Sequence, residues 1–428
     1  MYHQTNFSNG LRLITVPVKS AKTVAVMVLL PVGSRYESRQ LNGASHFIEH
    51  MMFKGTRKRP NTLAIAKELD GIGALYNAFT GKDHTGYWIK SAKEKLEIIL
   101  DILADMLFNS VFDKREFQRE KGVILEEIKM YQENPLLYID QLFEELLFQG
   151  QALGRSVSGR LANVRRMRYK HLFGYKKLFY RPGQMIVVIA GGVEKHQAVK
   201  LVKKFFLQYQ DKKRKRIKYK PFIKRKSEDD FRLKIFYKKD LKQAQVALGG
   251  FAYPYNHPRL EAATLLSIIL GGNMSSRLFI EVRERRGLAY SVRADLDKYQ
   301  DVGSYVIQAG VDKEKVPEAI KVILDELKKV RKNGVTKEEL SRAKDYLKGI
   351  VKISLENSGS LANWYGSQAL FADKIVSPTQ RLKKIKKVTR RQIREVIQDF
   401  FQKQTLKLAL IGPFRDKRFL LRILKGGV

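Results

Sequence analysis

The stretch GASHFIEHMMFKGT, residues 43–56, predicts a short helix that carries two kinds of side chain. Its apolar surface comes from four residues: Phe47, Ile48, Met51 and Met52. His46, Glu49 and His50 stand at positions i, i+3 and i+4, so they share one side of the same two turns. Three ionisable groups on one stripe of a largely apolar helix indicate a candidate functional site.

His46 and His50 can direct their ring nitrogens toward one point, which is the geometry that two imidazole ligands of a divalent metal need. Zn²⁺ is the usual ion at such sites of nitrogen and oxygen ligands. Glu49 lies on the same face and can act as a general base without binding the metal. The pattern H-x-x-E-H is the inverzincin signature. The alternative is two partly exposed histidines on an ordinary amphipathic helix.

A metal held by two histidines needs a third protein ligand, and the segment REFQREKGVILEEIKMYQ, residues 115–132, can provide it. The segment predicts an amphipathic helix on which Glu120 and Glu127 lie along nearly the same line. A carboxylate on an apolar stripe is costly unless a charge compensates it, and a metal would. Glu126 is turned toward a more polar side, so Glu127 is the better third ligand. Glu120 would orient a ligand or substrate group, although paired glutamates on helices are often simply exposed.

Composition bounds the class of protein. With 428 residues the chain is too long for one ordinary core, and 44% hydrophobic residues are enough to bury large cores. Cysteine is absent, which excludes disulfides, thiolate zinc sites and a cysteine nucleophile. The formal net charge is +39, with basic residues spread along the whole chain. We attribute this charge to a solvated basic surface, with a nucleic-acid or other anionic partner as the alternative.

The N-terminal residues MYHQTNFSNGLRLITVPV lack the basic segment, long apolar run and small-residue cleavage site of a secretory signal. The sequence contains no run of about 18 or more apolar residues, so it predicts no membrane-spanning helix. We therefore expect a cytoplasmic protein without a membrane partner.

The chain divides into two similar halves at the basic run DKKRKRIKYKPFIKRKSEDD, residues 211–230. This run predicts an exposed linker, with a nuclear-localisation or RNA-binding patch as the alternative. We place the N-terminal half at 1–210, the linker at 211–232 and the C-terminal half at 233–428. Each half begins with two β-rich runs, continues with long amphipathic helices and ends with a strand-like run. This order predicts an α+β fold with antiparallel pairing and indicates an old duplication.

The two halves differ at their first helix. Where the first half has HFIEHMMF, residues 46–53, the second has AATLLSIIL, residues 262–270, which is an uninterrupted apolar helix. The same place in the fold therefore tolerates a plain core helix, and the fold does not require the ionisable stripe. Asn42 or Ser45 is placed to cap the start of the first-half helix.

The segments HFIEHMMFKGT and REKGVILEEIKMYQENP resemble the inverzincin peptidases related to pitrilysin, insulin-degrading enzyme and mitochondrial processing peptidase. The resemblance covers essentially the whole chain. It includes GSRYE (33–37), NAFTGKDHTGYW (77–88), LGRSVSG (153–159), FYRPGQMIVVIAGGV (179–193) and LGGNMSSRLFIEVRERRGLAYSV (270–292). The length, with one pair of halves, is similar to the short prokaryotic and mitochondrial processing-type branch.

The resemblance implies a zinc endopeptidase with one Zn²⁺ per chain, bound by His46, His50 and Glu127. Glu49 would be the general base, and Glu120 stands where the family has an assisting carboxylate. The resemblance also implies two homologous halves, each a mainly antiparallel sheet with helices packed on one face. These halves would form a clamshell around extended or unfolded peptides.

The resemblance further assigns substrate-holding residues that the pattern alone does not reveal. The family has an Arg and a Tyr seven residues apart in its C-terminal half, and they match Arg283 and Tyr290. Their implied role is to hold substrate and to support the tetrahedral intermediate. The family's edge strand, with which an extended peptide pairs through main-chain hydrogen bonds, resembles Asn77, Ala78, Phe79 and Thr80.

Both residue sets lie in one chain, so we expect an active homodimer, with a monomer as the alternative. One rival function is a catalytically inactive scaffold or assembly subunit of the same fold, but the metal-ligand pattern is intact. The other is a basic nucleic-acid-associated protein, but no recognised nucleic-acid motif is present. The net charge of +39 predicts that acidic or neutral peptides are better substrates than the basic presequences taken by mitochondrial members.

Overall fold

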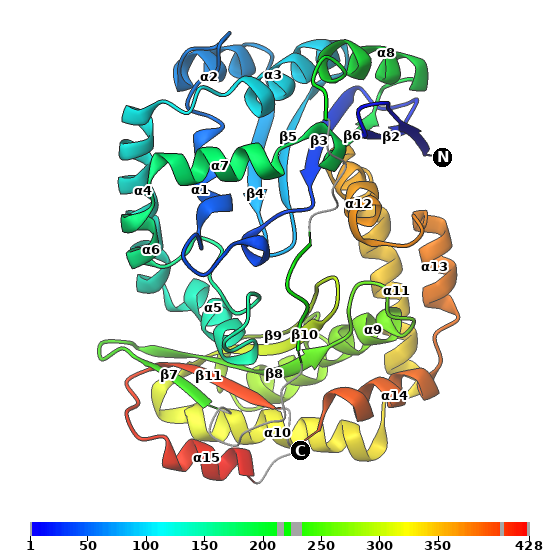
Figure 1. Cartoon of the computed structure of the whole chain (residues 1–428). Coiled ribbons are helices and arrows are strands. Elements are labelled where there is room, and N and C mark those ends of the chain that lie inside the picture. Colours follow the sequence, from blue (N-terminus) through cyan, green and yellow to red (C-terminus); the bar gives the residue numbers. More distant parts are fainter. Residues whose placement is uncertain (1, 212–217, 224–232, 403–405, 426–428) are drawn as a thin grey trace. The chain divides into compact units, whose positions relative to one another are not determined.

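The computed structural model describes residues 2–211, 218–223, 233–402 and 406–425 (Figure 1). Most of the predicted basic linker, residues 212–217 and 224–232, therefore lies outside the described residues. The chain forms two compact units. Unit 1 comprises Met1–Lys129, Arg155–Lys220 and Val351–Ser377, and unit 2 comprises Met130–Gly154, Pro221–Ile350 and Pro378–Val428. Each unit is thus assembled from three separate segments of the chain.

Unit 1 is built on a six-stranded sheet with the strand order β1-β2-β6-β3-β5-β4. Its strands are β1 (His3–Asn6), β2 (Arg12–Pro17), β3 (Thr23–Leu30), β4 (Leu75–Thr80), β5 (Thr85–Ala92) and β6 (Ile186–Gly191). β2 and β6 are parallel, and the other pairs are antiparallel. β3 and β6 are almost entirely apolar and buried, because both faces of the sheet are covered.

The helices of unit 1 lie on both sides of this sheet, and several of them contact it directly. They are α1 (Ala44–Met51), α2 (Thr62–Gly71), α3 (Leu96–Asn109), most of α4 (Lys114–Glu133), α6 (Leu161–Arg166), α7 (Tyr169–Phe179), α8 (Lys195–Phe206) and α12 (Ser358–Phe371). Alternate residues of β3 point to opposite faces. Val24, Val26 and Val28 join a core with α1, α3 and α8. Met27 and Leu29 instead join a second core with α12.

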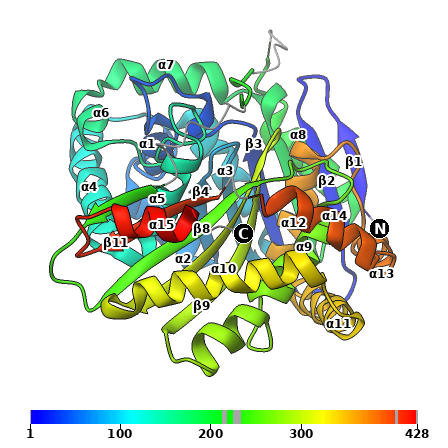
Figure 2. The same cartoon turned by 90° about the horizontal axis from the view of Figure 1, so that it is seen from below.

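Unit 2 is built on a five-stranded sheet with the order β7-β11-β8-β10-β9. Its strands are β7 (Leu233–Tyr237), β8 (Gln243–Ala252), β9 (Ala289–Lys298), β10 (Gly303–Asp312) and β11 (Lys407–Gly412). Its helical elements are α5 (Pro135–Leu147), α9 (Leu260–Gly271), a π-helical segment (Phe279–Glu284), α10 (Val316–Asn333), most of α11 (Lys337–Ser354), α13 (Pro378–Lys386), α14 (Arg390–Phe400) and α15 (Arg418–Lys425). Figure 2 shows α10 in yellow, and it contacts α14 and α15.

Five strands of the first sheet have the same topology as the whole second sheet. The order β2-β6-β3-β5-β4 in unit 1 is repeated by β7-β11-β8-β10-β9 in unit 2. In each sheet the first of these pairs is parallel and the next three are antiparallel. The strand-like runs predicted to end the two halves are β6 and β11, and the predicted long amphipathic helices include α3 and α10. The prediction of two α+β halves with one architecture is confirmed.

Each sheet also receives one helix from the opposite half of the chain. α12 comes from the C-terminal half and packs on β3 and β6 in unit 1, whereas α5 comes from the N-terminal half and packs on β8 and β11 in unit 2 (Figure 1). These two helices cover the sheet face for which the sequence predicted no helix. The boundaries at residues 210 and 233 stay a prediction about where the sequence repeats. The two packing units do not test them, because each unit contains segments from both halves of the chain. In the described part of the chain, no helix has the length and apolar character needed to cross a membrane.

Candidate metal centre

The first helix of unit 1, α1, is capped by a residue that precedes it by several positions. Its start requires glycine at Gly43, where φ is 102° and a Cβ would lie 2.7 Å from the carbonyl oxygen of Ser158. The buried carboxylate of Glu37 accepts hydrogen bonds of 2.7 Å from the N–H groups of Gly43 and Ser45. It therefore satisfies free helical N–H groups and complements the helix dipole. The expected cap by Asn42 or Ser45 is wrong, because Glu37 occupies that place and Asn42 donates to it at 3.0 Å.

The apolar stripe of α1 docks the helix against α4. Phe47, Ile48 and Met51 are fully buried, and the Phe47 ring stacks on that of Phe117, with centroids 5.0 Å apart. The stripe of ionisable residues is left less buried than this core surface. α1 and α4 are thus held together by apolar contacts next to the candidate ligands.

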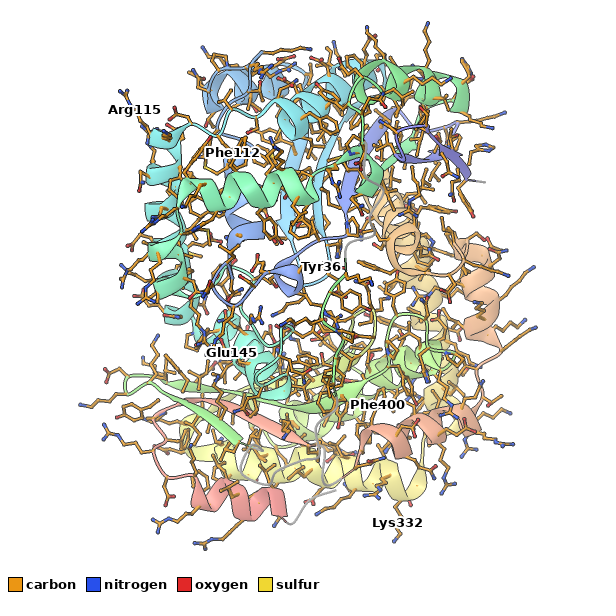
Figure 3. The ribbon with its side chains drawn as sticks, in the orientation of Figure 1. Tyr36, Phe112, Arg115, Glu145, Lys332 and Phe400 are labelled. Carbon is orange, nitrogen blue, oxygen red and sulfur yellow. The ribbon has the colours of Figure 1, made fainter. Side chains whose placement is uncertain are left out.

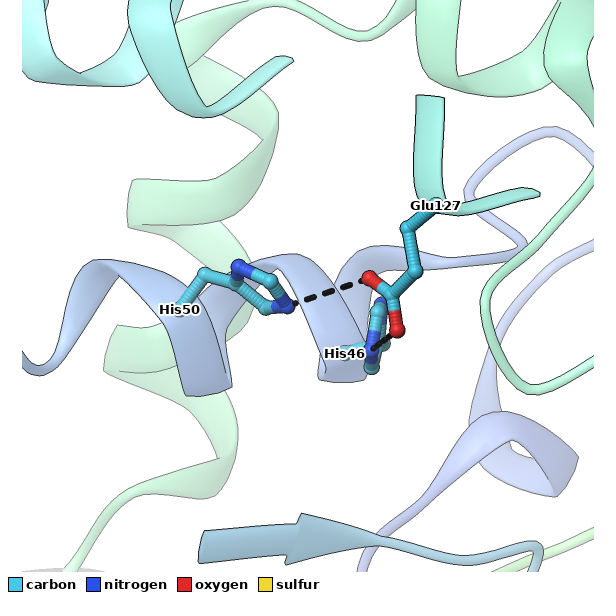
Figure 4. Close-up of side chains that lie close together, drawn as sticks. All are labelled: His46, His50 and Glu127. Atoms are coloured by element: carbon cyan, nitrogen blue, oxygen red, sulfur yellow. Dashed lines mark ion pairs between the residues drawn. The ribbon is translucent and has the colours of Figure 1, made fainter. Parts of the chain in front are cut away.

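His46, His50 and Glu127 converge on one point (Figure 4). Nε2 of His46 lies 3.6 Å from Oε1 of Glu127, and Nε2 of His50 lies 3.4 Å from Oε2. The three candidate ligand atoms are all within 4.8 Å of one another. A tetrahedral ion with bonds of about 2.0 Å separates its ligand atoms by about 3.3 Å. Small side-chain movements would therefore close this cluster on a single ion.

Unsatisfied polar atoms show that the cluster suits a metal. Among the described residues, Nδ1 of His46 and Oε2 of Glu127 are buried and have no hydrogen bond. Such atoms are rare because they cost free energy. An ion at the centre would give the Glu127 oxygen a partner. Two imidazoles and a carboxylate are also a donor set that zinc accepts, so these residues fit the metal.

The charges within the cluster strongly shift its protonation equilibria. Burial lowers the pKa of His50, but the hydrogen bond to Glu120 and the close contact with the Glu127 carboxylate outweigh burial and raise this pKa to about 9. Burial raises the pKa of Glu127, whereas the close contacts with His46 and His50 lower it to about 2. In the metal-free chain His50 therefore holds a proton that a metal would have to displace.

α4 directs two of its glutamates inward and one outward. Glu120 is 3% exposed, and its Oε2 lies 3.1 Å from Nδ1 of His50. The side chain of Glu127 is 22% exposed, whereas that of Glu126 is 72% exposed and pairs with Lys129 at 2.7 Å. Glu120 and Glu127 therefore face α1, and Glu126 faces solvent.

Lys54 is a neighbour of this cluster that the sequence analysis did not single out. Its Nζ lies 2.7 Å from Oε1 of Glu120. Burial raises the pKa of Glu120, but hydrogen bonds from His50 and Lys54 bring it below its usual value. The sequence feature that could have predicted this contact is the spacing of four residues between His50 and Lys54, which puts both on one side of a helical turn.

Glu49 lies on α1 beside the cluster and is held by the sheet. Oγ1 of Thr80 donates a hydrogen bond of 2.5 Å to Oε2 of Glu49. Thr80 is the last residue of β4, the edge strand of the six-stranded sheet. The predicted substrate strand, Asn77 to Thr80, is therefore at an edge and ends at Glu49. Within it, Oδ1 of Asn77 accepts a hydrogen bond from the N–H of Ala78.

The segment after α1 is tied to α2 and α3 by a buried charge network. The guanidinium of Arg59 donates to Glu68 at 2.6 and 2.8 Å, to Asp101 at 2.8 Å and to Asp105 at 2.9 Å. Arg59 and Asp105 have side chains only 7% and 1% exposed. Because one cation serves three carboxylates, this network fixes the exit of the metal-binding helix.

The connection from α3 to α4 is fixed as well. Phe112, labelled in Figure 3, is 2% exposed and has φ of 51°, a region that is rare for a bulky residue. The preceding N–H, of Val111, donates to the carbonyl oxygen of Gly55 at 3.2 Å, and Thr56 forms a β-bridge with Ser110. The start of α4 is thereby joined to the chain that leaves α1.

Arg283 and Tyr290 lie side by side in unit 2. Arg283 belongs to the π-helical segment, and its Cζ is 5.4 Å from the centroid of the Tyr290 ring and 4.8 Å from that of Phe279. Tyr290 is at the start of β9 and is 74% exposed. The structure thus brings this cation and this phenol together within their own unit.

Known proteins resemble the chain over nearly its whole length. Residues 12–160 match the family model described as insulinase, peptidase family M16, and residues 166–347 match the peptidase M16 inactive domain. An uncharacterized zinc protease of Streptomyces coelicolor is 34% identical over 97% of this chain and 90% of its own length. The chain belongs to the M16 peptidase family. YmxG of Bacillus subtilis, described in the same words, is 32% identical over 95% of this chain and 97% of its own.

Solved structures show the same M16 fold. A protease from Helicobacter pylori matches with a TM-score of 0.91 at 24% identity, covering 96% of this chain and 99% of that one. A peptidase M16 inactive domain from Pseudomonas fluorescens matches with a TM-score of 0.88 at 19% identity, covering 97% and 98%. The two family-model matches and the nearly full-length coverage of the two zinc-protease relatives assign the chain to the short, two-domain branch of the M16 family. Its candidate metal ligands all lie in the segment that matches the insulinase model.

Proposed function

We propose that this M16 protein is a zinc-dependent endopeptidase that hydrolyses extended or unfolded peptides, with one zinc ion per chain. The observation that carries the proposal is the convergence of the ligand atoms of His46, His50 and Glu127 within 4.8 Å. The description of two relatives as zinc proteases supports the choice of metal. An N/O donor set without sulfur is compatible with this ion.

Each of the neighbouring residues has a role in this proposal. When bound, zinc supplies a Lewis acid that lowers the pKa of water and polarises a carbonyl group. Glu49 does not belong to the ligand cluster, so its carboxylate is free to take a proton from water and give it to the leaving amine. Thr80 fixes Oε2 of Glu49 by its hydrogen bond. The β4 edge would bind the main chain of the substrate and so align the scissile bond with Glu49.

Arg283 and Tyr290 would hold the substrate and stabilise negative charge on the carbonyl oxygen. The two side chains are adjacent, Tyr290 is exposed and Arg283 is partly exposed, which suits a role in binding rather than in packing. Arg283→Ala should lower turnover and leave the zinc content unchanged. Loss of the metal in this variant would show that the role is misassigned. We also propose a homodimer, which light scattering coupled to size-exclusion chromatography would test.

The decisive experiment compares wild type, His50→Ala and Glu49→Gln for zinc content and for cleavage of a quenched, unstructured peptide. Wild type should bind about one zinc per chain and cleave in a chelator-sensitive manner. His50→Ala should lose both properties, whereas Glu49→Gln should keep the metal and lose turnover. A folded wild-type chain that neither binds supplied zinc nor cleaves peptides would support an inactive scaffold instead. Cleavage by Glu49→Gln would overturn the general-base assignment.

A further inference from the structure

Lys54 makes a direct contact with the carboxylate that supports a candidate metal ligand. It lies three residues after Met51, the last residue of α1, and its side chain is 21% exposed. Its Nζ lies 2.7 Å from Oε1 of Glu120, while Oε2 of the same carboxylate lies 3.1 Å from Nδ1 of His50. The two oxygens of Glu120 therefore have different partners, Lys54 on one side and His50 on the other.

The orientation of the His50 ring depends on this carboxylate. When Nδ1 carries a hydrogen and donates it to Glu120, Nε2 is left as the acceptor, and Nε2 is the atom that faces Glu127. Such outer carboxylates fix the tautomer and the direction of a metal-binding histidine. The effect requires that the Glu120 carboxylate itself be held in one rotamer.

Lys54 is the residue placed to hold it. The side chain of Glu120 is only 4% exposed, and a carboxylate in that position needs a compensating charge. A histidine that binds a metal through Nε2 is a neutral imidazole. Among the described side chains, Lys54 is then the cation that contacts Glu120. Its ammonium would keep Oε2 directed at His50.

We propose that Lys54 is a positioning residue for the metal centre: it anchors Glu120 so that His50 presents Nε2 to the ion. This inference rests on one part of the proposed function, the binding of zinc by the cluster, and does not depend on peptide hydrolysis. It extends that function to a residue outside the ligand set and outside the H-x-x-E-H pattern. Lys54 would touch neither the substrate nor the ion.

Lys58 offers a matched control in the same segment. It also forms an ion pair, with Asp101 at 2.6 Å, but its side chain is 58% exposed and its partner is on α3. Lys58→Met therefore removes the same charge and a comparable contact without affecting Glu120. Lys54→Arg tests rescue, because a guanidinium keeps the charge and can still donate to the carboxylate.

The test measures the zinc dissociation constant by chelator competition for wild type, Lys54→Met, Lys54→Arg and Lys58→Met. Lys54→Met should weaken zinc binding by about ten- to a hundredfold. Lys54→Arg should recover most of this loss, and Lys58→Met should bind like wild type. A lower melting temperature of metal-free Lys54→Met with an unchanged zinc dissociation constant would show a structural role and overturn the proposal.

A double-mutant cycle with Glu120→Gln separates positioning through Glu120 from any other effect. In the Glu120→Gln background, Lys54→Met should cause little further loss of zinc affinity. Fully additive losses would overturn the proposal, because Lys54 would then act independently of Glu120. Peptide hydrolysis is recorded in parallel. Wild type that binds zinc without cleaving peptides would refute the proposed function and leave this inference standing, whereas wild type that binds no zinc would refute both.

Discussion

The hydroxyl of Thr80 donates a hydrogen bond of 2.5 Å to Oε2 of Glu49. This contact joins the last residue of the edge strand β4 to the metal-binding helix α1. A peptide that paired with β4 would therefore run directly toward the proposed general base. The side chain of Thr80 thus connects β4 to Glu49, the proposed general base.

Removing this hydroxyl should impair catalysis more than metal binding. Hydrogen bonds to charged groups contribute about 1.5–3 kcal/mol, so Thr80→Val should lower kcat by about tenfold or more. Zinc content should not change, because Thr80 contacts no candidate ligand in the described structure. Steady-state kinetics checks this, with Thr80→Ser as the control that keeps the hydroxyl. Equal kcat values for Thr80→Val and wild type would contradict the coupling.

Zinc affinity should increase with pH well beyond the usual range of histidine. In the metal-free chain the pKa of His50 is raised to about 9 by Glu120 and Glu127, against the effect of burial. The metal must displace this proton, so affinity should rise by about tenfold per pH unit until pH 9 is reached. An unshifted histidine would stop contributing near pH 6.5. A competition titration from pH 6 to 9 measures this slope, and a plateau above pH 7 would contradict it.

The stability of the metal-free chain should decrease at high pH because of His50 and at low pH because of Glu127. The folded pKa of His50 is above its unfolded value, so its contribution is fully present below about pH 6.5 and is lost as pH rises through about 9. The pKa of Glu127 is depressed to about 2, so its contribution is present above about pH 4.5 and is lost as pH falls through about 2. Thermal unfolding of the metal-free chain between pH 5 and 9 should show the loss from His50. The control is the His50→Gln variant, in which this loss of stability should be absent.

Arg59 should be far more important for stability than its neighbour Lys58. Arg59→Met leaves Asp105, which is 1% exposed, without its guanidinium partner. Breaking a buried ion pair in this way costs about 3–5 kcal/mol, which corresponds to a melting temperature lower by roughly 10 °C. Lys58→Met removes an exposed pair with Asp101 and should cost at most about 1 kcal/mol. Differential scanning calorimetry of the two variants compares them, and similar melting temperatures would disprove the ranking.

Substrate charge should influence cleavage because the chain has a formal net charge of +39. Unlike charges raise the rate of encounter and like charges lower it. Peptides that differ only in net charge should therefore be cleaved in the order acidic, neutral, basic when kcat/KM is compared at low salt. Added salt should reduce the differences, since it screens charges beyond about 10 Å at 0.1 M. A preference for the basic peptide would refute this prediction.

Several features follow from the sequence because their causes are local. The spacing of His46, Glu49 and His50 places them on one stripe of any helix, since the period of 3.6 residues is fixed by the backbone. The same period distinguishes Glu127 from Glu126 on α4, whose side chains are 22% and 72% exposed. Strand and helix segments in both halves could likewise be predicted from their apolar patterns. The repeated order of these segments was enough to predict two halves of one architecture.

Other features arise only from the tertiary structure. Glu37 replaces the expected local cap of α1 because the chain between residues 37 and 43 brings its carboxylate to the free N–H groups. Lys54 reaches Glu120 because Phe47 stacks on Phe117 and so docks α1 on α4. α5 and α12 each pack on the sheet formed by the other half of the chain, because an apolar helix face does not specify which sheet will bury it. Local patterns thus determined which groups could act, and the non-directional burial of apolar surface decided which of them meet.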